Sequence, residues 1–136
     1  MIVGFVGFGE AGSTLGGGLA ASGVERIVAF DIATADPRLG PLLRERAQRT
    51  GTTLLDSPAA LAAAADVIFS TVTSSSALDA AVAIAPSLEA RHLYADLNSV
   101  SPALKQEMSA SIPSPLPTPG ETSRACRLRW GWAPCR

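Results

Sequence analysis

Three glycines at the end of a short apolar run constrain the fold of this chain more than any other feature. Residues 2–8 read IVGFVGF, a β-rich run typical of a strand that is buried on both faces. The glycines have the spacing G-x-G-x-x-G and are Gly7, Gly9 and Gly12. A helix is predicted over 11–22, with Gly23 at its end. The opening therefore predicts a strand, a glycine turn and a helix.

The same alternation continues along the chain. The predicted strands are residues 2–8, 26–31, 52–55, 66–72 and 91–98. The predicted helices are residues 11–22, 37–50, 57–65, 74–90 and 101–111, and the fourth of these segments is helical only until Pro86. Strands that alternate with helices at this spacing form a parallel sheet with helices on both faces, because each crossover is right-handed. The sequence therefore predicts a single α/β domain with a doubly wound parallel sheet (Rossmann) and the strand order 3-2-1-4-5.

The composition changes near the C-terminal end. Residues 112–136 contain alternating prolines, followed by four arginines, both tryptophans and both cysteines of the chain. Such a segment is typical of a Pro-rich end outside a packed core, or of a shifted reading frame. We therefore expect residues 1–111 to form the domain and residues 112–136 to be a peripheral or non-native tail.

Charge and cysteine content argue against several classes of partner. A net charge of −1 gives no electrostatic basis for binding nucleic acid or an anionic membrane. Glu10 interrupts the apolar opening, and no basic segment precedes it, so we expect neither a signal peptide nor a membrane anchor. We therefore expect the protein to be cytoplasmic. Cys126 and Cys135 have no second pair of ligands nearby, so we expect no metal site.

Each part of the opening motif has a physical role in binding a dinucleotide. Gly7 would make the tight turn, Gly9 would let the backbone approach a pyrophosphate, and Gly12 would let helix and strand pack closely. The N-terminus of the helix would supply amide donors. Asp31, at the end of the second predicted strand, would accept hydrogen bonds from the adenosine ribose.

The end of the fourth predicted strand adds two candidates. Val72 and Thr73 lie where parallel strands of open α/β proteins line their ligands. The cofactor-binding candidates are therefore Gly7, Phe8, Gly9, Glu10, Ala11, Gly12, Asp31, Val72 and Thr73.

Two motifs resemble the β-hydroxyacid dehydrogenases, which include 3-hydroxyisobutyrate and 6-phosphogluconate dehydrogenases. The opening resembles the family pattern G-L-G-x-M-G-x-x-M-A-x-x-L-x-x-x-G, although Gly16 departs from it and would weaken the helix by ~1 kcal/mol. The segment DLNSVSP at 96–102 is similar to the family's D-x-S-T-x-x-P substrate motif. The resemblance implies a nicotinamide cofactor and the reversible oxidation of a hydroxy acid. It also implies that Asn98 and Ser99 bind substrate.

Other functional parts of that family are not matched. The family has a P-V-S-G-G segment and a catalytic lysine in a second, helical domain, and no lysine follows Lys105 in this chain. We interpret Lys105 as a solvated surface lysine. We assign neither His92 nor the serines at 74–76 to a catalytic triad. We therefore expect a truncated chain without catalytic residues, which would take a hydroxy-acid substrate only if a second domain were supplied.

Two alternatives remain open at this point. The chain could be a cofactor-binding module without turnover. It could instead be an S-adenosylmethionine methyltransferase, which also places a glycine loop after its first strand, although the third glycine favours a dinucleotide.

The residues around Asp31 favour NAD, with NADP as the alternative cofactor. A carboxylate at this place binds both ribose hydroxyls of NAD but repels the 2′-phosphate of NADP. Ile32 follows Asp31 where NADP-preferring members of the family commonly have arginine. Arg38, shortly after, could still reach such a phosphate.

Overall fold

The computed structural model describes residues 1–112, and the predictions made for residues 113–136 lie outside this part of the chain. The described residues form a five-stranded sheet in the order β3-β2-β1-β4-β5. The strands are β1 (Ile2–Val6), β2 (Arg26–Phe30), β3 (Thr53–Leu54), β4 (Val67–Ser70) and β5 (Leu93–Asp96). Every neighbouring pair is parallel. The predicted fold class, a doubly wound Rossmann sheet, is thus confirmed.

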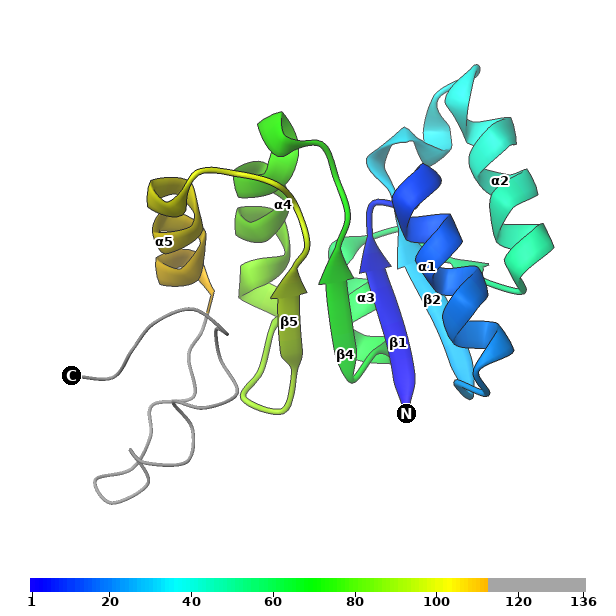
Figure 1. Ribbon diagram of the computed structural model, residues 1–136, viewed down its shortest axis with the longest axis horizontal. Helices are drawn as coiled ribbons and strands as arrows, with labels where there is room; N and C mark the ends of the chain where they lie inside the picture. Colours follow the sequence, from blue (N-terminus) through cyan, green and yellow to red (C-terminus); the bar gives the residue numbers. More distant parts are fainter. Residues whose placement is uncertain (113–136) are drawn as a thin grey trace.

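Helices cover both faces of the sheet (Figure 1). They are α1 (Glu10–Ala21), α2 (Leu39–Thr50), α3 (Pro58–Ala64), α4 (Ala77–Ile84) and α5 (Pro102–Ser111). Leu43 and Ala47 of α2 pack with Phe5 of β1 on one face. Leu61 of α3 and Ile84 of α4 pack on the other face. All strands are parallel, so their carboxyl ends meet at one edge.

The buried face of α1 consists mainly of small residues. Leu19 packs into the core, but Leu15 is 44% exposed, and Gly12, Ser13 and Gly16 are the buried residues of the helix. A Cβ on Gly16 would lie 3.3 Å from the ring of Phe8. Gly16 therefore lets the helix lie close to this ring, which offsets its poor helix propensity.

Capping residues begin and end several helices as their sequence signals indicate. The Ser57 hydroxyl accepts the N–H of Ala60 at 3.1 Å, and Ser101 accepts that of Leu104 at 3.3 Å. Gly51 ends α2 with φ of 67°, a left-handed conformation that glycine adopts without strain.

The helix predicted from residue 74 until Pro86 starts later than expected and ends near that proline. The short 3-10 turn η2 (Ser74–Ser76) precedes α4, and η3 (Ala85–Ser87) follows it around Pro86. Proline lacks the N–H that an α-helix requires, which explains the break at Pro86.

A further 3-10 turn, η1 (Ile32–Ala35), begins directly after β2 because the Asp31 carboxylate accepts the N–H of Ala33.

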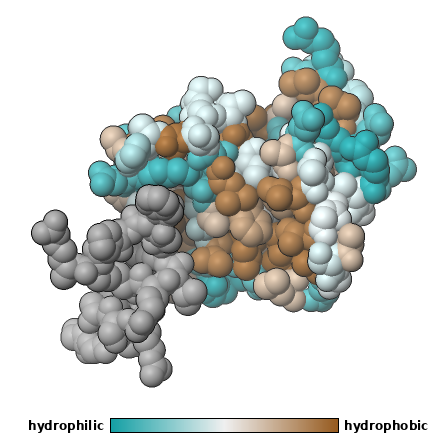
Figure 2. Space-filling model, in the orientation of Figure 1, coloured by the Kyte–Doolittle hydropathy of each residue, from teal (hydrophilic) through white to brown (hydrophobic). Residues whose placement is uncertain are grey.

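Within residues 1–112, no helix covers part of one sheet face (Figure 1). Figure 2 shows hydrophobic residues gathered at the centre of the molecule, in the same view as Figure 1. Leu93, at the start of β5, and Leu97, directly after its end, are 59% and 51% exposed. The uncovered area therefore belongs to the β5 side of the sheet.

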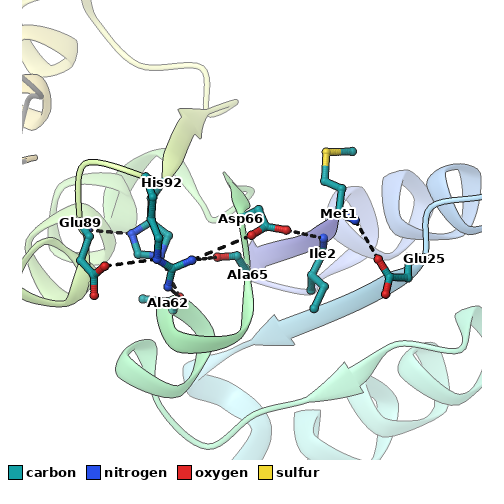
Figure 3. Close-up of polar contacts among 9 residues, drawn as sticks. Met1, Ile2, Glu25, Ala62, Ala65, Asp66, Glu89 and His92 are labelled. Carbon is teal, nitrogen blue, oxygen red and sulfur yellow. Dashed lines mark hydrogen bonds and ion pairs between the residues drawn. The ribbon is translucent and has the colours of Figure 1, made fainter.

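His92 lies at the amino edge, directly before β5 begins (Figure 3). Arg91 precedes it in the chain. The N–H of Glu89 donates to His92 Nδ1 at 2.7 Å, so Nε2 carries the ring proton and donates to Ala62 O at 2.9 Å. Arg91 donates to the same carbonyl at 3.3 Å. Both side chains satisfy the C-terminal end of α3, a structural role consistent with the interpretation that His92 marks no triad.

Candidate functional site

Position 7, the first glycine of the loop, requires a glycine for two reasons. Gly7 has φ of +84°, which L side chains rarely adopt. A Cβ here would lie 2.7 Å from Val72 Cγ1. The Gly7 N–H also donates to Phe30 O at 2.8 Å, so the loop continues the pairing of β1 with β2.

Gly12 lies against the loop and the end of β4. A Cβ on Gly12 would lie 2.6 Å from Gly7 O and 2.7 Å from Thr71 Oγ1. The Thr71 hydroxyl donates to Gly7 O at 2.7 Å and so joins the loop to β4. Sequence reasoning missed Thr71, since its partner lies far away along the chain and only its place at the end of a predicted strand hinted at a role.

Gly9 has surroundings of a different kind. It precedes α1 with no side-chain hydrogen bond to cap the helix, and a Cβ on it would meet nothing within 4 Å. The first N–H groups of a helix lack partners within it and attract anions. Glu10 and Ala11 are exposed in this first turn, whereas Phe8 is buried beneath it. The open approach to these N–H groups fits a pyrophosphate.

Asp31 connects the loop to the end of β2. Its Oδ2 accepts the N–H of Phe8 at 2.7 Å, and its Oδ1 accepts the N–H of Ala33 at 2.9 Å. These bonds fix the carboxylate beside the glycine loop, and each oxygen keeps acceptor capacity for a further donor. Ile32 is 89% exposed, and Arg38 is exposed at the start of α2.

Two turns complete this edge of the sheet. Val72 is partly buried against Gly7, and the exposed Thr73 donates its hydroxyl to Ser76 Oγ at 3.0 Å. The Ser74 hydroxyl donates to Ser99 O at 2.7 Å, which joins the turn after β4 to the turn after β5.

The two predicted substrate residues point in different directions. Ser99 is exposed, but Asn98 is buried and donates its side-chain amide to Ser70 Oγ at 2.9 Å and to the Asp96 carboxylate. Lys105 differs from the expected solvated lysine, because its ammonium forms an ion pair with Asp96, whose side chain is 5% exposed. The approach of α5 to β5 produces this pairing.

Tyr94 lies in the same region with its hydroxyl buried. Among the described residues the hydroxyl has no hydrogen-bond partner. Burial raises the pKa of the Tyr94 phenol, and the nearby Ser70 hydroxyl only partly opposes this.

Within residues 1–112, no group of three or more His, Cys, Asp or Glu side chains is placed to hold a metal ion. No helix in the described part of the chain has the length and apolar character needed to cross a membrane.

The structure thus brings the predicted cofactor residues to one edge of the sheet. The glycine loop lies at the end of β1, between Asp31 at the end of β2 and Thr73 beyond the end of β4. The chain turns from β1 to opposite sides for β2 and β4, and such a switch point is where open α/β sheets bind dinucleotides.

Comparison with known proteins agrees with this geometry. A family model described as the NAD binding domain of 6-phosphogluconate dehydrogenase matches residues 2–114. A search of curated proteins gives no match. The family match favours the dinucleotide interpretation over the methyltransferase alternative.

Solved structures share the fold. A conserved hypothetical protein from Sinorhizobium meliloti 1021 is 36% identical, with a TM-score of 0.76, and the match covers 82% of this chain and 37% of that one. Prephenate dehydrogenase from A. aeolicus, in complex with hydroxyphenyl propionate and NAD+, is 19% identical, with a TM-score of 0.68 and coverage of 82% and 38%. Pyrroline carboxylate reductase from Plasmodium falciparum, with NADP bound, is 19% identical, with a TM-score of 0.62 and coverage of 85% and 39%.

The chain spans less than two fifths of the length of these proteins. The family match over residues 2–114 coincides with the sheet, the glycine loop and the following turns. The chain therefore belongs to the family of NAD-binding domains typified by 6-phosphogluconate dehydrogenase.

Proposed function

We propose that this domain binds NAD in preference to NADP. The observation that carries the proposal is the Asp31 carboxylate, which two backbone N–H groups hold beside the glycine loop. In this position it would accept both hydroxyls of the adenosine ribose, and it would repel a 2′-phosphate. The pyrophosphate would lie at the N-terminus of α1, over Gly9.

The other half of the dinucleotide would lie over β4 and β5, because Asp31 holds the adenosine half on the opposite side of β1. Val72 and Thr73 would line it on the β4 side, and Ser99 faces solvent on the β5 side.

Titration calorimetry with NAD and NADP at fixed ionic strength tests this choice. We expect NAD to bind at least ~10-fold more tightly, a difference of about 1.4 kcal/mol. Asp31→Asn should reduce this preference. The matched control is Asp66→Asn, since the Asp66 carboxylate also accepts a backbone N–H, that of Ile2 at 2.8 Å, but at the amino edge of the sheet.

Equal or tighter NADP binding by the unchanged protein would contradict this role of Asp31. Arg38→Ala then identifies the reason, because loss of NADP binding in that variant would show that Arg38 reaches the phosphate.

We further propose that the domain is the cofactor-binding part of a hydroxyacid dehydrogenase-like oxidoreductase and that the 136-residue chain has no turnover by itself. Bound NAD would supply the hydride acceptor, and the domain would orient it. In this chain no lysine follows Lys105, and the ammonium of Lys105 is already paired with the Asp96 carboxylate. A small hydroxy acid would be bound only together with a second domain.

An assay of NAD reduction with a panel of hydroxy acids checks this point. We expect no NADH above the background rate. Steady NADH formation in proportion to protein concentration would show that the chain is catalytic.

The proposal also includes three further points: a cytoplasmic location, the lack of nucleic-acid and membrane partners, and the peripheral nature of residues 112–136. Cell fractionation tests the location, binding assays test the partners, and deletion of 113–136 tests the tail.

A further inference from the structure

A buried polar cluster lies below the turn that follows β5. It consists of Ser70, Asp96, Asn98 and Lys105, and we refer to it as the Asn98 cluster. The Asn98 amide donates to Ser70 Oγ at 2.9 Å and to the Asp96 carboxylate. Lys105 donates to Asp96 O at 3.2 Å and forms an ion pair with the Asp96 carboxylate.

The members of this cluster are withdrawn from solvent. Ser70 is fully buried, Asn98 is 8% exposed, and the side chains of Asp96 and Lys105 are 5% and 24% exposed. Buried charges are tolerated when they are paired, and buried amides when they are hydrogen-bonded. Each member therefore depends on the others.

The cluster joins the turn at 97–101 to its neighbours from three sides. Asn98 joins the turn to β4 through Ser70, and Asp96 joins it to α5 through Lys105. Two further bonds hold the backbone of the turn: Leu97 N–H donates to Ser70 O at 3.0 Å, and the Ser74 hydroxyl donates to Ser99 O at 2.7 Å.

Asn98 thus directs its amide N–H groups into the protein. The exposed residues of the turn are Leu97, Ser99 and Ser101. Any effect of Asn98 on a ligand is therefore transmitted through the position of the turn.

We propose that Asn98 is a positioning residue: held by the Asp96–Lys105 ion pair, it fixes the turn at 97–101 against the nicotinamide half of the bound dinucleotide. This inference rests on the proposed function, which places the adenosine half at Asp31 and the nicotinamide half over β4 and β5. Weakening the contacts within the cluster should then reduce only the contribution of the nicotinamide half to the binding affinity.

Titration calorimetry with NAD and with ADP-ribose isolates the contribution of the nicotinamide ring, because ADP-ribose has the adenosine, both phosphates and the second ribose but no nicotinamide. The variants are Asn98→Asp, which keeps the shape and removes the amide donors, and Lys105→Met, which removes the partner of Asp96. Lys105→Arg keeps the charge, and Gln106→Ala changes an exposed neighbour on α5.

We expect Asn98→Asp and Lys105→Met to weaken NAD binding about tenfold, whereas ADP-ribose binding changes less than about twofold. Lys105→Arg and Gln106→Ala should retain the NAD to ADP-ribose affinity ratio of the unchanged protein. Circular dichroism verifies that each variant is folded, and Asn98→Ala replaces Asn98→Asp if two adjacent carboxylates prevent folding.

Equal weakening of both ligands would mean that the cluster is merely structural, and no weakening of either would mean that the turn does not meet the dinucleotide. Both results overturn the inference. Failure of the unchanged protein to bind ADP-ribose would instead refute the proposed function, and the inference with it.

Discussion

Separate alanine substitutions at Gly9 and Gly12 distinguish the ligand-facing part of the glycine loop from its packed part. A Cβ on Gly9 meets nothing within 4 Å, and φ there is −68°. A Cβ on Gly12 lies 2.6 Å from Gly7 O and 2.7 Å from Thr71 Oγ1. The two variants add the same methyl group and differ in what it contacts.

The expected destabilisation follows from these contacts. In Gly12→Ala, overpacking costs about 1–3 kcal/mol and the displaced hydrogen bond from Thr71 to Gly7 about 1 kcal/mol. The better helix propensity of alanine offsets about 1 kcal/mol. We expect the free energy of unfolding to fall by about 1–3 kcal/mol, which lowers Tm by about 4–12 °C for a domain of this size.

In Gly9→Ala two small effects oppose each other. Alanine is a poorer N-cap than glycine by about 0.5–1 kcal/mol, but it reduces the entropy of the unfolded chain by a similar amount. We expect Tm to stay within about 3 °C of the unchanged protein. NAD affinity should nevertheless fall by about tenfold or more, because the methyl group occupies the space over the first N–H groups of α1.

Thermal denaturation followed by circular dichroism measures the first effect, and calorimetric titration with NAD the second. Gly9→Ala that binds NAD as tightly as the unchanged protein would refute the assignment of the open space to the pyrophosphate. Gly12→Ala with unchanged Tm would refute the close approach of α1 to Thr71.

Three further predictions concern stability. Ser57→Ala should lower the free energy of unfolding by about 1 kcal/mol in urea denaturation, since it removes the cap of α3; an unchanged midpoint would show that this cap is dispensable. Gly51→Ala should cost about 1–2 kcal/mol in the same assay, because its φ of 67° strains alanine although a Cβ has free space there, and Gly23, with φ of +86°, is the comparison site. Tyr94→Phe removes the only tyrosine and a buried hydroxyl without a partner among the described residues, so stability at neutral pH should be equal or higher. The pKa of the Tyr94 phenol is raised in the folded state, so the free energy of unfolding is unaffected by this group below about pH 10, the unfolded pKa, and falls as the pH rises above it. Tyr94→Phe should lack this alkaline decline. If the free energy of unfolding of both proteins fell in parallel with rising pH, the burial of the phenol would be contradicted.

Local signals in the sequence were sufficient for the order of elements and for the place of the glycine loop between β1 and α1. Caps such as Ser57 and Ser101 and the glycines at 7, 9 and 12 act on residues within a few positions, so their effects can be inferred without the fold. The alternation of strands and helices, combined with right-handed crossovers, leaves few topologies, and the predicted strand order is the observed one.

Only the tertiary structure decided which polar groups meet across the sheet. Thr71 reaches Gly7, Asn98 turns inward to Ser70, and Lys105 pairs with Asp96, although the segment around Lys105 resembles a solvated helix. These contacts depend on the register of β1, β4 and β5 and on the docking of α5. Register follows from burial of apolar side chains over the whole sheet, a property that no short stretch of sequence contains.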